Sequence, residues 1–458
     1  MATVTHAVLE REAPDWHPQP RAAAFLRQIL DAFCADCPPA RTLAERLRSQ
    51  TGTRLLDWID HVALPGGEDL AGHLRDLGFV LSDDPRRAVW DHPDGLFPPV
   101  EQCEPGPRRV AIQVESVADF LVRNRIGDKT HVDGAPLAPL RRAEIGAGRD
   151  TQFWVVERHG YRGWEPPEIT LHQLQAVLWH WDMFRQRKRD FADEEAGLDH
   201  ARSLLRAAVE DLGTGRATDL FFSAEREYWT KRNRAAGLQK ARQDALGLGW
   251  ANHDHHTYRS SREHFAGLIG ILEELGLECR ERFYAGREAG WGAQVLEQRE
   301  SSVVVFADVD LGPEEVAEDF AHQPLGPQGR FGTVGLWCKL HGEAFLQAGM
   351  HHLECRFDFD AAREQLQQAG IEVMEPFTNL PYLKQAFTQG EVWPVEPNRI
   401  RAALSAGAIT AQHADRFQES GAIGSHLEIL QRDDGYKGFN KAGISEILRE
   451  TDPRKRHP

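Results

Sequence analysis

The chain has 458 residues, and 54 Lys and Arg against 70 Asp and Glu give it a formal net charge of −16. This acidic balance argues against a nucleic-acid backbone or an anionic membrane surface as partner. No apolar stretch approaches the length of a membrane span, and the first residues lack a basic segment followed by an apolar run. Six scattered cysteines are too few for a disulfide scaffold, so we expect a cytoplasmic protein with reduced thiols.

The first predicted elements are helices, followed by a strand. Residues 20–50 carry apolar side chains three and four positions apart, which predicts an N-terminal helical cap over residues 1–50. A short strand around His61 comes next, then a helix that ends near Gly78. Further strands are expected near 79–82, 88–90 and 109–114. This order predicts a βαβββ module over residues 51–115.

A long amphipathic region separates this module from the next. Apolar residues recur at helical spacing, with charged faces between them, over residues 171–188, 196–212 and 222–244. We therefore expect residues 116–249 to form a large, mainly helical insertion.

Two more openings of the same kind define a second and a third module. The second, over residues 250–348, begins at the strand of His255, and the third, over residues 349–458, begins at the strand of His352. Their other expected elements are a helix and three strands at 262–275, 278–284, 292–298 and 301–309, then a helix and a strand at 360–369 and 372–377. Residues 381–418 are expected to be helical and loop-like. Together with His61 these openings form a weak internal repeat, and the predicted fold class is α+β.

The last strand, expected over residues 425–432, carries a carboxylate among apolar neighbours. Alternation along a strand places His426, Glu428 and Leu430 on one face. A buried carboxylate is costly unless a cation compensates it. Either a metal ion binds Glu428, or this is an edge strand whose glutamate faces water. A closing helix is expected from Asn440.

The end of the chain resembles the C-terminal signature of the 4-hydroxyphenylpyruvate dioxygenases in two stretches, LEILQR from Leu427 and GYKGF from Gly435. In those vicinal oxygen chelate enzymes the glutamate of such a strand is an Fe(II) ligand. In length and order of parts the whole chain resembles a second branch of that superfamily, the 2-oxoadipate dioxygenase/decarboxylases, also called hydroxyglutarate synthases. The resemblance implies modules that form an open barrel around one divalent iron, held by two histidines and one glutamate.

Modules two and three would supply the ligand set His255, His352 and Glu428. The pair Asp254-His255 resembles the first ligand motif of the hydroxyphenylpyruvate branch, and Gly349 followed by His352 resembles the second. Such a site needs two imidazoles and one carboxylate on one face of an octahedron, which leaves three positions open. Taken singly, each of these histidines is more often a packed or capping imidazole.

A competing ligand set combines His61 with His255 and Glu428, since His61 matches the first ligand position of the oxoadipate branch. That branch has an arginine four residues after its first histidine, for the distal carboxylate of the substrate, and this sequence has Pro65 there. Arg259 follows His255 by four residues and is a candidate carboxylate anchor. Gln431 is a candidate for orienting the substrate.

The resemblance implies an Fe(II)-dependent dioxygenase that couples oxidative decarboxylation of a 2-oxo acid to hydroxylation. Its partners would be the 2-oxo acid and O₂, without a separate 2-oxoglutarate and without nucleic acid or membrane, and a homodimer is a candidate assembly. The alternative is a non-oxidative isomerase or lyase that uses Zn, Ni or Mn on a small carboxylic acid, because fold does not fix reaction. A third hypothesis is a binding protein that has lost its metal.

Overall fold

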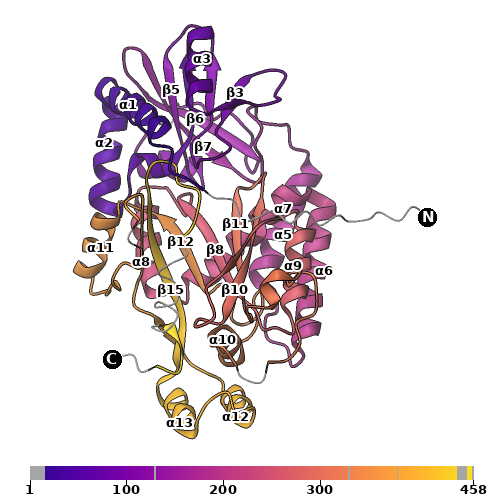
Figure 1. Cartoon of the computed structure of the whole chain (residues 1–458). Coiled ribbons are helices and arrows are strands. Elements are labelled where there is room, and N and C mark those ends of the chain that lie inside the picture. The colour runs from indigo at the N-terminus through magenta and orange to yellow at the C-terminus, as the bar shows by residue number, and fades with distance from the viewer. Residues whose placement is uncertain (1–15, 128–129, 329–330, 379, 441–450, 456–458) are drawn as a thin grey trace.

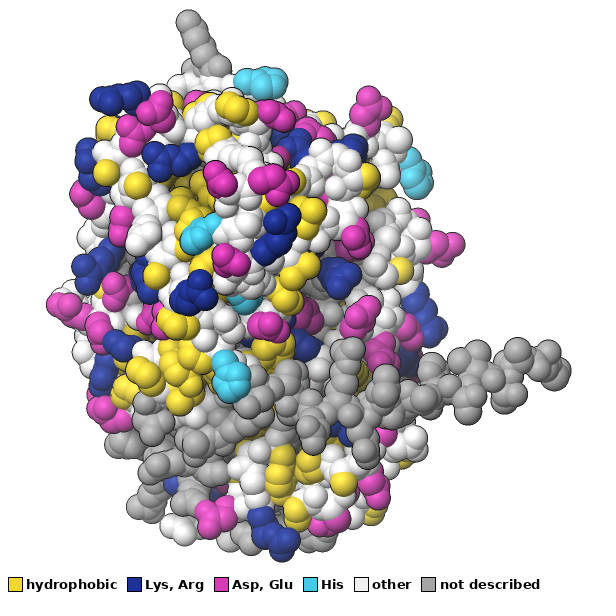
Figure 2. All heavy atoms as spheres, turned by 45° about the horizontal axis from the view of Figure 1, so that its top comes forward, with side chains coloured by type: hydrophobic (Ala, Val, Ile, Leu, Met, Phe, Trp, Pro, Cys, Tyr) yellow, Lys and Arg dark blue, Asp and Glu magenta, His cyan; other side chains and the backbone are white. Residues whose placement is uncertain are grey.

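A computed structural model describes residues 16–127, 130–328, 331–378, 380–440 and 451–455 of the chain. Two mixed β-sheets, each packed against helices, make up an α+β architecture, with the first sheet at the top of Figure 1 and the second below it. Within the described ranges, no helix combines the length and the apolar character needed to cross a lipid bilayer. Figure 2 shows basic and acidic side chains interspersed over one face, rather than the continuous basic patch typical of nucleic-acid binding.

Two N-terminal helices cover the first sheet, as the periodicity of residues 20–50 predicts. They are α1 (Pro20–Asp36) and α2 (Pro38–Arg46), and each begins with proline, whose fixed φ suits the first helical turn. Helix α1 buries Leu26, Leu30 and Phe33 against this sheet. Two short helical turns, Leu47–Thr51 and Leu55–Trp58, then lead into the first strand.

The first sheet has seven strands in the order β2-β3-β4-β1-β5-β7-β6. The bounds of its strands and of the two helices between them are β1 (Ile59–Pro65), α3 (Glu68–Asp76), β2 (Val80–Leu81), β3 (Ala88–Asp91), β4 (Val100–Cys103), β5 (Arg108–Gln113), α4 (Val117–Arg123), β6 (Leu140–Ala147) and β7 (Thr151–Arg158).

Strands β6 and β7 correct the expectation that residues 116–249 are mainly helical from their start. Strand β7 reads TQFWVVER, a run of aromatic and β-branched residues that suits a pleated, half-buried surface. It pairs in parallel with β5, and Phe153 and Val155 enter the core of the first sheet. The missed signal was this β-type composition.

The remainder of that region is helical, and α5 (Leu171–Gln186), α6 (Glu194–Leu212) and α7 (Thr214–Thr230) form the helical lobe on the right of Figure 1. Helix α8 (Arg234–Ala245) lies on the left of Figure 1, where it packs against β15 and the turn Leu47–Thr51. The helix predicted over residues 222–244 is two helices, because the side chain of Asn233 accepts a hydrogen bond from the backbone N–H of Ala236 and starts a new helix there.

The second sheet has eight strands, seven of them in the order β13-β15-β12-β8-β11-β10-β9, while β14 pairs with β15. Their bounds are β8 (His253–Arg259), β9 (Glu278–Tyr284), β10 (Trp291–Gln298), β11 (Val303–Asp310), β12 (His352–Arg356), β13 (Leu383–Phe387), β14 (Glu391–Trp393) and β15 (Ala422–Arg432). The remaining helices are α9 (Phe265–Glu274), a short turn Glu315–Ala317, α10 (Thr333–His341), α11 (Phe359–Gln368), α12 (Pro397–Ser405) and α13 (Ala411–Ser420).

Two modules build this sheet and meet where β8 and β12 pair antiparallel. The run β8-α9-β9-β10-β11 is a βαβββ unit, and the run from β12 through α11 to β15 is the second. The predicted fold class is therefore confirmed, and across the described residues the sheet stays open.

Two details of the third module differ from prediction. Strands β13 and β14 lie within residues 381–418, which were expected to be helical and loop-like. The strand expected over 372–377 is reduced to a single bridge between Val373 and Thr388. The closing helix expected after Asn440 falls mainly on residues 441–450, outside the described residues.

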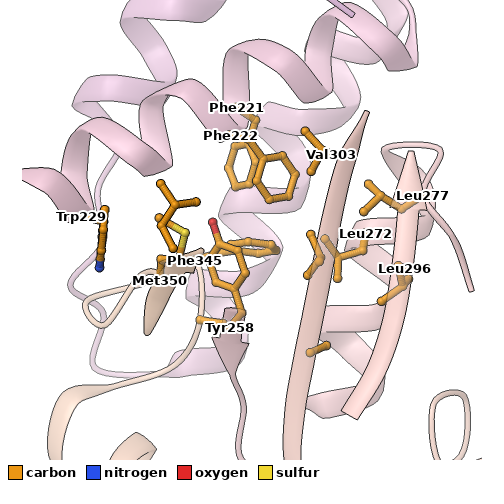
Figure 3. Packing of buried hydrophobic residues seen from close by; sticks show 14 of the residues in the cluster. Phe221, Phe222, Trp229, Tyr258, Leu272, Leu277, Leu296, Val303, Phe345 and Met350 are labelled. Carbon is orange, nitrogen blue, oxygen red and sulfur yellow. The ribbon is translucent and has the colours of Figure 1, made fainter. Parts of the chain in front are cut away.

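One face of the second sheet packs against the helical lobe. Figure 3 shows Phe221 and Phe222 reaching from α7 toward Tyr258 and Phe345. Ring centroids are 5.0 Å apart for Phe221 and Phe345 and 4.8 Å apart for Tyr258 and Phe345. Because side chains alternate along β8, Tyr258 occupies this apolar core and its neighbours His255, Thr257 and Arg259 face the other way.

The aromatic packing predicts a large loss of stability for Phe222→Ala. The side chain is fully buried, so truncation should lower the free energy of unfolding by about 3–5 kcal/mol. Chemical denaturation followed by circular dichroism measures this value. Val122→Ala, at a side chain that is 75% exposed, is the control and should change it by less than about 0.5 kcal/mol. Equal effects of the two substitutions would contradict the described packing.

Candidate metal centre

Three neighbouring strands of the second sheet place ionisable side chains in one row. In the register of the sheet, Glu354 on β12 pairs with His255 on β8 and with Glu428 on β15. Directly paired residues project to the same face. His352, two positions before Glu354, shares that face because side chains alternate along a strand. These four side chains lie on the face turned away from the helical lobe.

The four side chains converge and are buried, none with more than 7% of its surface exposed. Candidate ligand atoms of His255, His352 and Glu354 lie within 4.8 Å of one another. The Nε2 atom of His352 is 3.3 Å from Oε2 of Glu428, and Nδ1 of His255 is 2.5 Å from Oε2 of Glu354. Imidazoles and carboxylates grouped in this way are a donor set for a divalent transition metal.

Asp254 links this group to two arginines. Its Oδ1 atom lies 3.1 Å from Nδ1 of His255 and accepts a hydrogen bond from Nη2 of Arg432, and its Oδ2 atom accepts one from Nε of Arg356. Burial alone would raise the pKa of the Asp254 carboxyl, but the Arg432 guanidinium outweighs it and holds the pKa well below its usual range. Asp254 is therefore a fixed anion beside His255.

Glu428 is in the opposite situation. Burial, together with the neighbouring Glu354 carboxyl, raises the pKa of Glu428 well above its ordinary value. Its Oε1 atom accepts a hydrogen bond of 3.2 Å from the side-chain amide of Gln385 on β13. Two carboxyl groups this close and this deeply buried require either a proton or a cation between them. A divalent ion fits that requirement.

The surroundings of His352 favour its neutral form, which is the form that binds metals. Burial lowers the pKa of His352 well below its ordinary value, and the nearby His255 ring adds to the effect. A neutral imidazole has a free lone pair for a metal ion. One ring nitrogen of His352 is already engaged, because its Nδ1 lies 2.7 Å from Nδ1 of His351. Its Nε2 atom, on the Glu428 side, is the one available to an ion.

The structure brings together three of the four histidine and glutamate ligands expected from sequence: His255, His352 and Glu428. The fourth, His61, lies on β1 in the other sheet. There its Nδ1 atom is 2.6 Å from a carboxylate oxygen of Asp60, and its ring packs against Trp164 at 4.7 Å. Among the described residues, the converging group that contains His255 and His352 has Glu354 as its carboxylate, and no such group contains His61 or Glu428. The geometry therefore favours the two histidines of modules two and three, with Glu428 beside His352.

Arg259 shares the face of β8 that carries His255. It is 2% exposed, and its Nε and Nη1 atoms have no hydrogen-bond partner among the described residues. The nearest carboxylate oxygen, on Asp308, is 4.0 Å from Nε, and the guanidinium lies 5.7 Å from the ring centre of Trp337. A buried guanidinium with unused donors is suited to hold an anionic group.

Gln431 does not reach this face. Its Oε1 atom accepts a hydrogen bond from the backbone N–H of Phe359 at the start of α11, and its amide donates to Asp433. Three positions separate Gln431 from Glu428, and alternation therefore places them on opposite sides of β15. The structure thus gives Gln431 a role in anchoring α11, in place of the expected contact with substrate.

Two residues of the centre escaped the sequence reasoning, Glu354 and Gln385. The signal for Glu354 was present, because an acidic residue two positions after a candidate ligand on a strand must share its face. Gln385 could not be found, since its segment was expected to be helical. Gln385 shares one face of β13 with Leu383 and Phe387, and this spacing of two residues is the pattern that identifies it.

The large cavity of the molecule lies elsewhere. It has a volume of about 1010 Å³, and its lining includes Asp60 of the first sheet, Arg216 of the helical lobe, and Arg356 and Arg432 of the second sheet. None of His255, His352, Glu354 and Glu428 lines it. The cavity therefore borders the arginines that hold Asp254 but does not open onto the candidate ligands.

Comparisons with known proteins give fold-level likenesses only. No family model and no curated protein matches the chain. A variant of 4-hydroxymandelate synthase from Streptomyces coelicolor is 13% identical and aligns over 86% of this chain and 99% of its own, with a TM-score of 0.29. An uncharacterized protein from Shigella flexneri is 12% identical over 63% and 85%, with a TM-score of 0.25. Methylmalonyl-CoA epimerase from Mycobacterium tuberculosis is 14% identical over 40% and 88%, with a TM-score of 0.23. TM-scores this low assign neither a family nor an activity to the chain.

Substitution of the converging ligands should abolish metal binding. We expect His352→Ala and Glu428→Ala to purify without the divalent ion that wild type retains, since each removes one donor of the set. His61→Ala is the matched control, and it should keep the wild-type metal content. Inductively coupled plasma mass spectrometry measures the ion per chain. Loss of metal in His61→Ala with retention in His352→Ala would support the competing ligand set.

Asp308 predicts a pH dependence of stability in the metal-free protein. Burial raises the pKa of Asp308 to about 8, from 3.8, despite the nearby Arg259. Between these values the unfolded chain has lost the proton and the folded chain retains it, so the free energy of unfolding falls as pH rises. Asp308→Asn should reduce the fall in melting temperature between about pH 5 and pH 8. Asp360→Asn, at a side chain that is 78% exposed, is the control and should leave this fall unchanged. A wild-type slope in Asp308→Asn would contradict the assignment.

Proposed function

We propose that this protein is a metal-dependent enzyme of the vicinal oxygen chelate type, and that it is an Fe(II)-dependent dioxygenase that oxidatively decarboxylates a 2-oxo acid. One observation carries the proposal: ligand atoms of the buried His255, His352 and Glu354 converge on the adjacent strands β8 and β12, and Oε2 of Glu428 on the next strand, β15, lies 3.3 Å from Nε2 of His352. Two imidazoles and one carboxylate match the donor set of non-haem Fe(II) oxygenases.

Each residue of the centre has a separate task in this proposal. His255, His352 and Glu428 would hold the ion, and Gln385 fixes Glu428 through its hydrogen bond. Fe(II), when bound, supplies redox chemistry toward O₂ and a template for a chelating 2-oxo carboxylate. Aromatic rings beside the two histidines exclude water from the site. The ring centroid of Phe306 lies 4.5 Å from that of His255, and the ring centroid of Phe387 lies 5.0 Å from that of His352.

Arg259 is the candidate anchor for an anionic group of the substrate. Its unused donors lie on the same face as His255, four residues further along β8. A carboxylate bound there would engage the unused donors of a buried guanidinium whose Nε lies 4.0 Å from the carboxylate of Asp308. This placement favours a 2-oxo acid that carries a second anionic group.

A non-oxidative reaction is the alternative, and Asp308 is the observation that favours it. A buried carboxyl with a pKa of about 8 is suited to transfer a proton near neutral pH, as an isomerase or lyase requires. O₂ uptake by the Fe(II)-loaded protein, measured with a panel of 2-oxo acids, separates the two reactions. Substrate-dependent O₂ consumption with CO₂ release supports the oxygenase, and turnover without O₂ supports the alternative.

Arg259→Met should weaken substrate binding without loss of metal. Removal of one charge-assisted interaction costs about 1.5–3 kcal/mol, which corresponds to a rise in KM of roughly 10–150-fold for the preferred 2-oxo acid. Initial rates of O₂ uptake measure KM, and metal analysis runs beside them. Arg282 lies on β9 of the same sheet, is half-exposed and pairs with Asp319. Arg282→Met is therefore the control and should leave KM unchanged. An unchanged KM in Arg259→Met would remove Arg259 from the site.

A further inference from the structure

The large cavity has no task in the proposed function, because none of the candidate metal ligands lines it. Three buried arginines form part of its wall, and two of them have an acidic partner. Nη2 of Arg432 lies 3.1 Å from Oδ1 of Asp254, and Nη1 of Arg216 lies 3.7 Å from Oδ2 of Asp219. The third, Arg226, forms no ion pair among the described residues. The charge of Asp219 reaches it only from beyond 4.0 Å.

The direct contacts of Arg226 are neutral. Its Nη2 atom donates a hydrogen bond of 2.8 Å to Oγ of Ser223, and its Nη1 atom lies 3.1 Å from Nε2 of His256. Nδ1 of His256 is 3.3 Å from the backbone oxygen of Val304, which places the proton of the ring on Nδ1 and leaves Nε2 as an acceptor. The Nε atom of Arg226 has no hydrogen-bond partner in the described part of the chain. The guanidinium therefore lacks a counter-ion, and burial of an unpaired charge is costly.

Helix α7 presents Arg226 to the cavity. Wall residues recur on this helix at spacings of three and four, which defines a single helix face: Leu220, Ser223, Arg226 and Thr230. Aromatic side chains from three other segments line the cavity as well: Trp164, Trp181 and Trp250. A volume of about 1010 Å³ is that of a site for a small organic molecule. The cavity thus combines an uncompensated cation with large aromatic surfaces.

We propose that this cavity is a second ligand site, which binds an organic anion with an aromatic or apolar body. The anionic group of the ligand pairs with Arg226 and supplies the missing counter-ion, and the body of the ligand packs against the tryptophans. The site is separate from the metal centre, since its wall contains none of the candidate metal ligands. The inference therefore goes beyond the proposed function and stands without it.

Two fluorescent probes that share their rings and differ in charge test the inference. Anilinonaphthalene sulfonate is an aromatic anion, and phenylnaphthylamine has the same rings without the sulfonate. Each is titrated into the purified protein, and the rise in fluorescence gives Kd and stoichiometry. Arg226→Gln removes the charge but keeps an amide that can donate to Ser223. Arg206→Gln, at an exposed arginine on α6 that pairs with Glu274, is the control.

Wild type should bind one molecule of the sulfonate per chain. In Arg226→Gln the Kd of the sulfonate should rise roughly 10–150-fold, because one charge-assisted interaction is lost. The Kd of phenylnaphthylamine should stay within about threefold of wild type, since the apolar walls are unchanged. The control should match wild type with both probes.

Three results would overturn the inference. Equal losses of both probes in Arg226→Gln would show that Arg226 only supports the fold of the cavity. Absence of sulfonate binding to wild type, or an unchanged Kd in Arg226→Gln, would show that no anion binds beside Arg226. Weaker sulfonate binding in Arg259→Met, with wild-type binding in Arg226→Gln, would place the anion beside the metal centre instead.

Ser223→Asp keeps the arginine and tests the same point where circular dichroism finds Arg226→Gln unfolded. Because Oγ of Ser223 is 2.8 Å from Nη2 of Arg226, a carboxylate at this position supplies a counter-ion from within the chain. The Kd of the sulfonate should again rise roughly 10–150-fold, while the neutral probe still binds. Sulfonate binding as in wild type would contradict the inference. None of these results changes the metal content, which remains the test of the metal centre.

Discussion

Two carboxyl groups, those of Glu354 and Glu428, are buried side by side on neighbouring strands, and this is the constraint on which the second sheet depends. The parallel register of β12 and β15 sets them opposite each other. The same register sends Leu353 and Ile429 into the apolar core on the other face. A slip of one residue would turn Leu353 or Ile429 away from the core and a glutamate into it. The packing of the core therefore also fixes the positions of the two glutamates. The fold cannot relax the carboxyl groups apart without loss of the core.

The surrounding residues show how the molecule accommodates this charge. Cationic side chains compensate Asp254, which lies beside His255, because Arg432 and Arg356 both pair with it. The partners of Glu354 and Glu428 are instead neutral or weakly basic: an amide from Gln385 and the imidazoles of His255 and His352. Such a group is balanced by a divalent ion better than by another arginine, since imidazole and carboxylate can all donate to one small cation. The preference of the site for a divalent ion therefore follows from the burial of two carboxyl groups without a cationic side chain beside them.

Much of this arrangement was predictable from sequence, because it depends on alternation and on module order. The strand of Glu428, the strand openings at His255 and His352 and the βαβββ order of the second module all follow from local patterns. Strands β6 and β7 and strands β13 and β14 were missed, since their partners are far apart in sequence and tertiary pairing decides them. For the same reason Gln385 was not foreseen. Which histidine joins Glu428 also needed the structure: His61 and His352 open similar strands, and only sheet order separates them.

X-ray crystallography of the protein grown with Mn(II) or Fe(II) tests the central claim most directly, through anomalous diffraction at the absorption edge of the metal. The account predicts one anomalous peak per chain, at about 2.0–2.3 Å from a nitrogen of His255, Nε2 of His352 and an oxygen of Glu428. A peak bound to His61, or crystals saturated with metal that show no peak between β8, β12 and β15, would contradict it.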